Sequence, residues 1–318
     1  MGSKAEKSKD ASDFVVRFWG VRGSFPVSGE SFLHFGGNTS CVEIRAGGRL
    51  VVCDMGTGII RLGNELLRAH VRSSGDKGGR EPVEATILVS HAHHDHTQGF
   101  PFFKPAYLDS SDLHIFGPRV FNEDFREIMA RAMMAPLFPV DLADMRSRQV
   151  IRNVEESELI VLRPDKAPEM VNTQRNEVKI ESKAVTIRVL KNLAHPKGGV
   201  VNYRISYDGR SVVYATDVEG YVGGDARLVN FSRETDLLIH DAQYLPEEYT
   251  GLPVPTQGFG HSTYEMAGVV ARAAGVKRLA LFHHDPSHSD ADVREIERQT
   301  ARIFPNSFAA HEGQEVYL

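Results

Sequence analysis

Short apolar runs separated by glycine, proline and polar residues dominate the chain, and such runs predict strands. The predicted strands are Phe14–Gly20, Cys41–Ala46, Arg49–Asp54, Ala85–Val89, Leu113–Gly117, Leu159–Leu162, Val178–Glu181, Val185–Leu190, Val201–Tyr207, Val212–Ala215, Leu237–His240 and Leu279–Phe282. Apolar residues recur at helical spacing in Ile59–Val71, Phe125–Met134, Thr263–Ala274 and Ala291–Ile303. This alternation favours one layered α/β domain over residues 14–318, with two sheets face to face and helices outside, after a disordered tail at residues 1–13.

One predicted helix carries an unusual amount of apolar surface. Phe125–Met134 contains Met129, Met133 and Met134, and the apolar residues 136–139 follow it. A methionine stripe is more often part of a core, but its polarizable side chains also suit an adaptable pocket wall. We therefore treat residues 101–150 as a candidate lid or as a contact between the subunits of a homodimer.

Composition narrows the class of protein. The 318 residues are 41% hydrophobic and 25% charged, as in ordinary globular proteins. The net charge of −5, from 37 basic and 42 acidic residues, gives no electrostatic footprint for long nucleic acid. The sequence contains neither a long apolar run nor a charged-then-apolar leader, so we expect no membrane span and no signal peptide. Cys41 and Cys53 are too few for a disulfide framework, which predicts buried thiols in a cytoplasmic protein.

The densest cluster of histidines follows the predicted strand Ala85–Val89. Four of the fourteen histidines fall within His91–His96. In an extended chain His91 and His93 point the same way, while the side chain of Asp95 can turn back from the start of the next helix. Imidazole nitrogens with a carboxylate suit zinc or a similar first-row ion, and their spread over two directions suits two ions. The alternative, a solvated histidine-rich loop, fits a lone histidine better than this spacing.

A second ion needs ligands from elsewhere in the chain. A histidine or an aspartate follows three other apolar runs, and these residues are His195, Asp217 and His283. Each of them alone is as readily a polar residue in a turn at the end of a strand. Together with the histidine motif, the three favour one shared site.

The His-x-His-x-Asp-His spacing and the later positions resemble the metallo-β-lactamase superfamily over nearly all of residues 14–318. The resemblance implies a single domain with the αβ/βα four-layer sandwich fold and two ions at one edge of the stacked sheets. It also implies two ligand sets with a bridging aspartate, namely His91, His93 and His195, then Asp95, His96 and His283, with Asp217 between them. Asp54 matches an aspartate that steadies the metal loop without binding metal, which is the role we expect for it.

Positions that differ between branches of the superfamily narrow the resemblance. Flavin-linked di-iron members carry glutamate at the position of His93, and the commonest zinc β-lactamases carry cysteine at that of Asp217. The stretches Gly260–Thr263 and Asp236–Ala242 resemble motifs of the phosphodiesterase branch that includes ribonuclease Z, with Asp241 in place of a glutamate. In that branch a histidine at the position of His261 assists protonation of the leaving group.

The resemblance therefore implies a dinuclear-zinc phosphodiesterase, with Mn²⁺ as the alternative metal. In it Asp95 would orient the attacking hydroxide as well as bind metal, and His261 would protonate the departing oxygen. The alternative is that His261 serves only as a residue at the start of a helix and takes no part in catalysis. His284, next to the expected ligand His283, either contacts the phosphate or is solvated.

Residues 18–24 and 36–41 resemble bacterial members of this branch that act on small substrates, including cyclic nucleotides. We see no long basic arm of the kind that clamps transfer RNA. The expected substrate is therefore a cyclic nucleotide or a similar small phosphodiester. The alternatives are RNA 3′-end processing and a metal-stabilised sensor without catalysis.

Overall fold

The computed structural model describes residues 13–73, 79–175, 180–181, 183–221 and 223–318. Within those residues, the first sheet consists of seven strands in the order β15 (Glu315–Tyr317), β1 (Phe14–Gly20), β2 (Cys41–Ala46), β3 (Arg49–Cys53), β4 (Glu84–Leu88), β5 (Asp112–Pro118) and β6 (Arg148–Val154). Strands β3 to β6 run parallel, whereas β15, β1, β2 and β3 pair antiparallel.

The second sheet, in the same described part of the chain, has eight strands in the order β14 (Ser307–Ala309), β13 (Leu279–Phe282), β12 (Leu237–Asp241), β11 (Arg210–Ala215), β10 (Val200–Tyr207), β9 (Val185–Asn192), β7 (Glu158–Leu162) and β8 (Glu169–Asn172). Strands β11 to β14 run parallel. Strand β9 runs in the same direction, because both β9 and β11 pair antiparallel with β10. The carboxyl ends of β9, β11, β12 and β13 therefore meet at one edge of this sheet.

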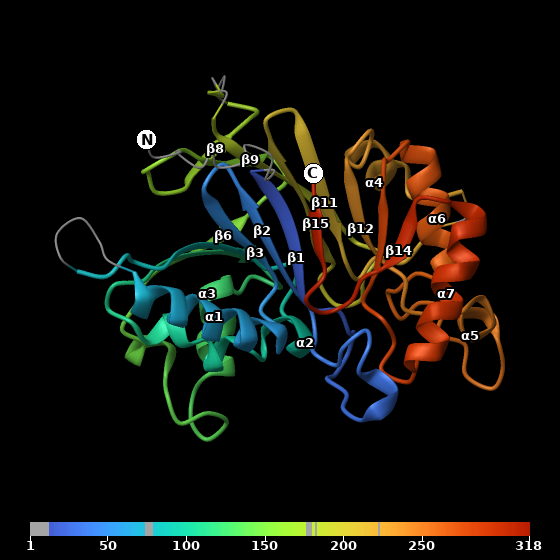
Figure 1. Cartoon of the computed structure of the whole chain (residues 1–318), viewed down its shortest axis with the longest axis horizontal. Coiled ribbons are helices and arrows are strands. Elements are labelled where there is room, and N and C mark those ends of the chain that lie inside the picture. The colour runs from blue at the N-terminus through green and yellow to red at the C-terminus, as the bar shows by residue number, and fades with distance from the viewer. Residues whose placement is uncertain (1–12, 74–78, 176–179, 182, 222) are drawn as a thin grey trace, which may run out of the picture.

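Helices cover the outer faces of both sheets (Figure 1). They are α1 (Gly58–Arg72), α2 (His94–Thr97) and α3 (Phe125–Ala132) on the side of the first sheet, and α4 (Ala226–Phe231), α5 (Pro246–Thr250), α6 (Tyr264–Ala274) and α7 (Asp290–Ile303) on the side of the second. One apolar core lies between the sheets, a second lies under α1 and α3, and a third lies under α4 and α6. This arrangement confirms the predicted four-layer α/β sandwich.

Four strands of the described residues escaped prediction, namely β6, β8, β14 and β15, and the last two have only three residues each. Strand β6 reads Arg-Gln-Val-Ile-Arg-Asn-Val and is only partly buried at the edge of its sheet, while β8 has four residues. Half of the predicted strand Val178–Glu181 lies outside the described residues, and its described half, residues 180–181, belongs to no strand. All but the last residue of the predicted tail at 1–13 also lies outside the described residues. Cys41 and Cys53 are buried and free, as predicted. In the part of the chain that is described, no helix has the length and apolar character needed to cross a membrane.

The inter-sheet core packs directly beneath the candidate site. Phe282, the last residue of β13, is fully buried, and its ring centroid lies 6.1 Å from that of Phe18 and 5.7 Å from that of Tyr214. Phe282 thus joins side chains from both sheets immediately before His283.

We predict that Phe282→Ala lowers the free energy of unfolding by roughly 3–5 kcal/mol, because a buried ring is lost and a cavity remains. Denaturant unfolding measures this change. The matched control is Phe25→Ala, since Phe25 is 58% exposed. Equal losses for the two variants would contradict the proposed contribution of Phe282 to the core.

Candidate metal centre

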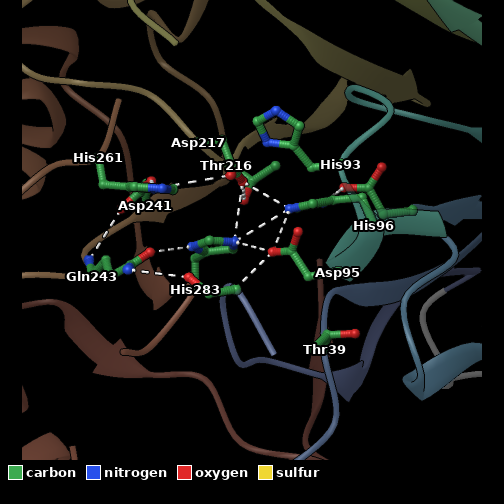
Figure 2. A network of polar contacts seen from close by, with 12 residues as sticks. Thr39, His93, Asp95, His96, Thr216, Asp217, Asp241, Gln243, His261 and His283 are labelled. Atoms are coloured by element: carbon green, nitrogen blue, oxygen red, sulfur yellow. Dashed lines mark hydrogen bonds and ion pairs between the residues drawn. The ribbon is translucent and has the colours of Figure 1, made fainter. Parts of the chain in front are cut away.

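Loops at the ends of six strands bring the predicted site residues together (Figure 2). Asp54 follows β3, the histidine motif follows β4, His195 follows β9 and Asp217 follows β11. His283 follows β13 directly, and Asp241 is the last residue of β12. Because the carboxyl ends of parallel strands share an edge, residues far apart in sequence converge in one cleft.

The side chains form two groups whose ligand atoms lie within 4.8 Å of one another. The first group is His91, His93 and His195, and the second is Asp95, His96, Asp217 and His283. In the first, Nε2 of His195 lies 3.1 Å from Nδ1 of His93. In the second, Nε2 of His96 lies 3.3 Å from Nε2 of His283 and 3.1 Å from Oδ2 of Asp95. His93 is the one solvent-exposed member of the two groups.

Asp217 divides its two oxygens between the groups. Its Oδ2 lies 3.2 Å from Nε2 of His96 and 3.3 Å from Nε2 of His283. Its Oδ1 faces the other group, 3.7 Å from Nε2 of His91 and 3.9 Å from Nε2 of His195. A carboxylate that bridges two ions requires this division.

Acceptors behind three of the histidines fix their orientation. Nδ1 of His96 lies 2.7 Å from Oδ2 of Asp54, that of His195 lies 3.0 Å from the Gly260 carbonyl oxygen, and that of His283 lies 2.9 Å from Oε1 of Gln243. When each Nδ1–H donates to its acceptor, the lone pair of Nε2 points into the cleft, which is the tautomer that binds a metal ion.

The donor set fits a pair of metal ions. Nε2 of His91 is buried and has no hydrogen-bond partner among the described residues, and two pairs of imidazole nitrogens face each other at 3.1 and 3.3 Å. Bare nitrogens at such distances repel unless a cation lies between them. Nitrogen and carboxylate donors without thiolate suit zinc and its first-row neighbours. The two groups therefore form a dinuclear metal site.

Electrostatics in the centre favour positive charge. Burial raises the pKa of Asp217, but the surrounding histidines, His283 first, hold it well below its ordinary value. Burial lowers the pKa of His96, yet the nearby carboxylates, Asp217 first, raise it well above its ordinary value. Burial and His96 lower the pKa of His91 well below its ordinary value. Ionised carboxylates and neutral imidazoles bind metal, so His96 releases a proton when an ion binds.

His261 lies at the edge of the centre against Asp241. Its Nδ1 lies 2.7 Å from Oδ2 of Asp241, so the aspartate reaches the histidine although it replaces a longer glutamate. The backbone N–H groups of Gln243 and Ser262 donate to the other oxygen of Asp241. Burial lowers the pKa of His261, but the Asp241 carboxylate outweighs it and raises the pKa to about 9. The ring of His261 also stacks on that of His283, and their centroids are 5.0 Å apart. His261 is therefore close enough to the ligand groups to bind metal itself.

His284 departs from expectation. It is buried, its Nε2 lies 2.9 Å from the Ala310 carbonyl oxygen, and its ring packs against Phe35. Of the two alternatives for His284, phosphate contact or solvation, solvation is therefore wrong, because segments distant in sequence cover it. Burial and the nearby Arg22 lower the pKa of His284 to about 3, so its ring is neutral at ordinary pH.

The loop after β1 contributes contacts that sequence reasoning missed. The backbone N–H of Ser24 donates to Oδ2 of Asp95 over 2.8 Å, and a Cβ on Gly23 would lie 2.4 Å from the His283 ring. The guanidinium of the fully buried Arg22 donates to the backbone carbonyls of Gly36, Asp285 and His288. Arg22 thus ties this loop to the segment that follows His283.

The candidate lid is only partly exposed. Met129 and Met133 pack in the core beneath α1 and α3, whereas Met134 is 50% exposed. Helix α3 forms one wall of a pocket whose lining includes His91 and His93. Met129 thus serves both expected purposes, because it packs in the core and lines this pocket.

Fold and paired His/Asp groups define a metallohydrolase of the αβ/βα sandwich class. The chain belongs to the β-lactamase superfamily, whose domain model matches residues 49–284. A ribonuclease Z of Metallosphaera sedula is 28% identical over 282 residues, covering 81% of this chain and 85% of that protein.

Solved structures share the fold. The metallo-β-lactamase fold protein YhfI of Bacillus subtilis matches with a TM-score of 0.62 and 18% identity, covering 95% of this chain and 98% of that one. A diphosphatase of the PhnP family matches with a TM-score of 0.63 and 15% identity. The match covers 96% of this chain and 98% of that one. The predicted family resemblance is confirmed.

We predict that the protein saturates at two zinc-like ions per chain and that Asp217→Ala reduces this number, because one carboxylate serves both groups. Mass spectrometry of the metal content after dialysis measures it. His94→Ala is the matched control, since His94 belongs to the same motif but to neither group. Saturation of the unaltered protein at one ion would refute the dinuclear site.

We predict that Arg22→Met lowers the free energy of unfolding by about 3 kcal/mol or more, because three carbonyls lose their donor and the bond to the His288 carbonyl is buried. Denaturant unfolding again provides the measurement. Arg298→Met, which removes an exposed ion pair with Glu295, is the control and should leave stability unchanged. An Arg22→Met variant with an unchanged free energy of unfolding would show that these carbonyls find other donors.

Proposed function

We propose that this protein is a dinuclear-zinc phosphodiesterase in which His261 supplies the proton to the leaving group. The enzyme is a metal-dependent phosphoric diester hydrolase. The observation that carries the assignment of roles is the His261–Asp241 pair beside the two ligand groups. A centre that only binds metal has no need of a buried histidine held by its own carboxylate.

Seven residues would hold the ions, in the sets given above, with Asp217 shared. When bound, such ions lower the pKa of coordinated water and neutralise charge on phosphoryl oxygens. Asp95 is itself positioned by the Ser24 N–H, 2.8 Å from its Oδ2, and the same oxygen lies 3.1 Å from Nε2 of His283. This carboxylate would orient the attacking oxygen as well as bind metal.

His261 would hold its proton on Nε2. Its Nδ1–H donates to Asp241, so the imidazolium form carries a second proton that Nε2 can give to the departing ester oxygen. Asp241 stabilises that charged form, and the backbone N–H groups on its other oxygen keep it in place. Asp241 is thus a positioning residue.

The substrate we propose is a small phosphodiester such as a cyclic nucleotide. Support comes from the net charge of −5 and from motifs shared with members acting on small substrates. The second candidate is RNA 3′-end processing, which the name of the Metallosphaera sedula relative favours. A sensor without turnover is the third, and the complete ligand groups speak against it. A homodimer and a cytoplasmic location stay predictions.

One assay separates the three candidates. Zinc-loaded protein is tested against bis(p-nitrophenyl) phosphate, 2′,3′- and 3′,5′-cyclic nucleotides and a precursor transfer RNA at one ionic strength. A small-diester enzyme turns over the first two classes and leaves the RNA intact. Cleavage of the RNA alone would assign the second candidate, and metal binding without turnover the third.

We predict that His261→Ala slows hydrolysis of a nucleotide diester by roughly 10²–10⁴, the usual contribution of a positioned general acid. The defect should shrink for a p-nitrophenyl diester, because p-nitrophenolate departs without protonation. Steady-state rates on both substrates measure the difference, with metal content determined in parallel.

The control for this prediction is His34→Ala, an exposed histidine outside the centre. Equal defects on both substrates would assign His261 to structure or phosphate binding. Loss of metal in His261→Ala would place it among the ligands, which its stacking on His283 also permits.

A further inference from the structure

A pocket of about 480 Å³ adjoins the first ligand group. Its lining includes His91 and His93 of that group and Ile128, Met129 and Ala132 of α3. Such a volume lies within the roughly 300–1,000 Å³ typical of small-ligand sites, and its wall is mainly apolar with a few polar groups, as such sites require.

We propose that this pocket binds an aromatic ring, a nucleobase in the natural substrate, on the ester group that stays attached to phosphorus. The proposal rests on the proposed function, because the phosphorus must lie at the two ligand groups. The occupant is inferred from continuity with that centre, from the apolar wall and from Phe121 at the rim.

Phe121 occupies a position that a phenylalanine rarely takes. Val120 and Glu123 exchange both backbone hydrogen bonds around a two-residue turn, in which Phe121 has φ 47° and Asn122 has φ 72°. Turns of this kind favour asparagine, aspartate or glycine at both places, because a Cβ crowds the backbone at positive φ. Asn122 meets that preference and Phe121 does not.

The ring of Phe121 gains little from the protein core in return. Phe121 is 75% exposed, yet it lines the pocket. A strained backbone that presents an exposed ring to a cleft indicates function, because neither packing nor turn chemistry selects phenylalanine there. A flat ring at the rim suits stacking on another aromatic ring.

The loop that carries His195 also lines the pocket. Pro196, Lys197 and Gly199 line the pocket, and a Cβ on Gly198 would lie 3.0 Å from Val120. The turn of Phe121 therefore packs against the ligand loop, which fixes the distance between ring and metal centre. Lys197 is exposed on this wall and adds a cation beside the path of an anionic phosphodiester.

The geometry also indicates which part of the phosphodiester enters the pocket. Figure 2 shows His93 and His261 on either side of Asp217. His93 lines the pocket and His261 is not among its lining residues. If the leaving oxygen faces His261, the ester oxygen that keeps its bond to phosphorus lies on the side of His93. In a cyclic nucleotide both oxygens belong to one ribose, so its base stays attached to phosphorus through the oxygen on that side.

The test compares ligands that differ only in the ring. Zinc-loaded protein is titrated by calorimetry with AMP, with ribose 5-phosphate and with phenyl phosphate. The unaltered protein should bind AMP at least tenfold more tightly than ribose 5-phosphate. Phe121→Asn should weaken AMP binding by roughly 5–50-fold, the loss expected for one base–aromatic stack, and leave ribose 5-phosphate unchanged.

Two further variants sharpen the result. Phe121→Trp should retain the preference for AMP, because it keeps an aromatic face. Phe259→Ala is the matched control, since Phe259 is 53% exposed but lies just before His261 and outside the pocket. It should leave the ratio of the AMP and ribose 5-phosphate affinities unchanged.

Stability should move in the opposite direction from binding. Asparagine suits φ 47°, so Phe121→Asn should raise the melting temperature by about 1–3 °C while it weakens binding. A variant that loses both stability and binding would assign Phe121 a structural role and overturn the proposal. So would equal affinity of the unaltered protein for AMP and ribose 5-phosphate.

Phenyl phosphate distinguishes the two sources of an aromatic ring. Tight binding that Phe121→Asn abolishes would extend the pocket to aryl esters, whereas weak binding would restrict it to nucleobases. The two experiments together distinguish failure of the proposed function from failure of the proposed pocket. A protein that hydrolyses no diester yet prefers AMP refutes the function, whereas diester hydrolysis without that preference overturns the pocket alone.

Discussion

The buried carboxylate of Asp54 joins the fold to the metal centre. It is fully buried and accepts four hydrogen bonds, from the backbone N–H and the hydroxyl of Ser90, from Nδ1 of His96 and from the hydroxyl of Tyr214, all within 2.8 Å. A buried charge is tolerated only when its partners satisfy it in this way. Because Tyr214 belongs to the second sheet and Ser90 follows strand β4 of the first, the packing of the sheets and the orientation of His96 depend on one another.

Several residues of the centre occupy the left-handed region of backbone conformation. Asp54, Asp217 and His283 have φ values of 62°, 53° and 62°, and each follows the last residues of a strand. This conformation turns the chain at once, so that the side chain enters the cleft instead of continuing along the strand. It is unfavourable for residues with a Cβ, by roughly 1–3 kcal/mol each, and persists where surrounding contacts determine it. Ligand geometry is thus maintained by the stability of both sheets.

The sequence reveals the ligands more readily than what holds them. His195, Asp217 and His283 could be predicted because each follows an apolar run, and strand direction then brings them together. Gln243, the Gly260 carbonyl and the Ser24 N–H were not foreseen, since a lone amide or a backbone group has no pattern. The burial of His284 likewise depends on Phe35 and Ala310, whose approach is a matter of tertiary packing. Strand β6 was missed because three apolar residues in seven at a sheet edge resemble a loop.

The wall of the pocket is anchored separately from the ligands. The side chain of Asn153, in β6, accepts from the Phe125 N–H and donates to Asp124, which caps α3. These contacts tie the helix to an edge strand that carries no ligand. The turn before α3 meets the ligand loop where Val120 approaches Gly198. Substitutions in α3 and its turn can therefore reshape the pocket while the histidines keep their acceptors, which separates the choice of substrate from the chemistry at phosphorus.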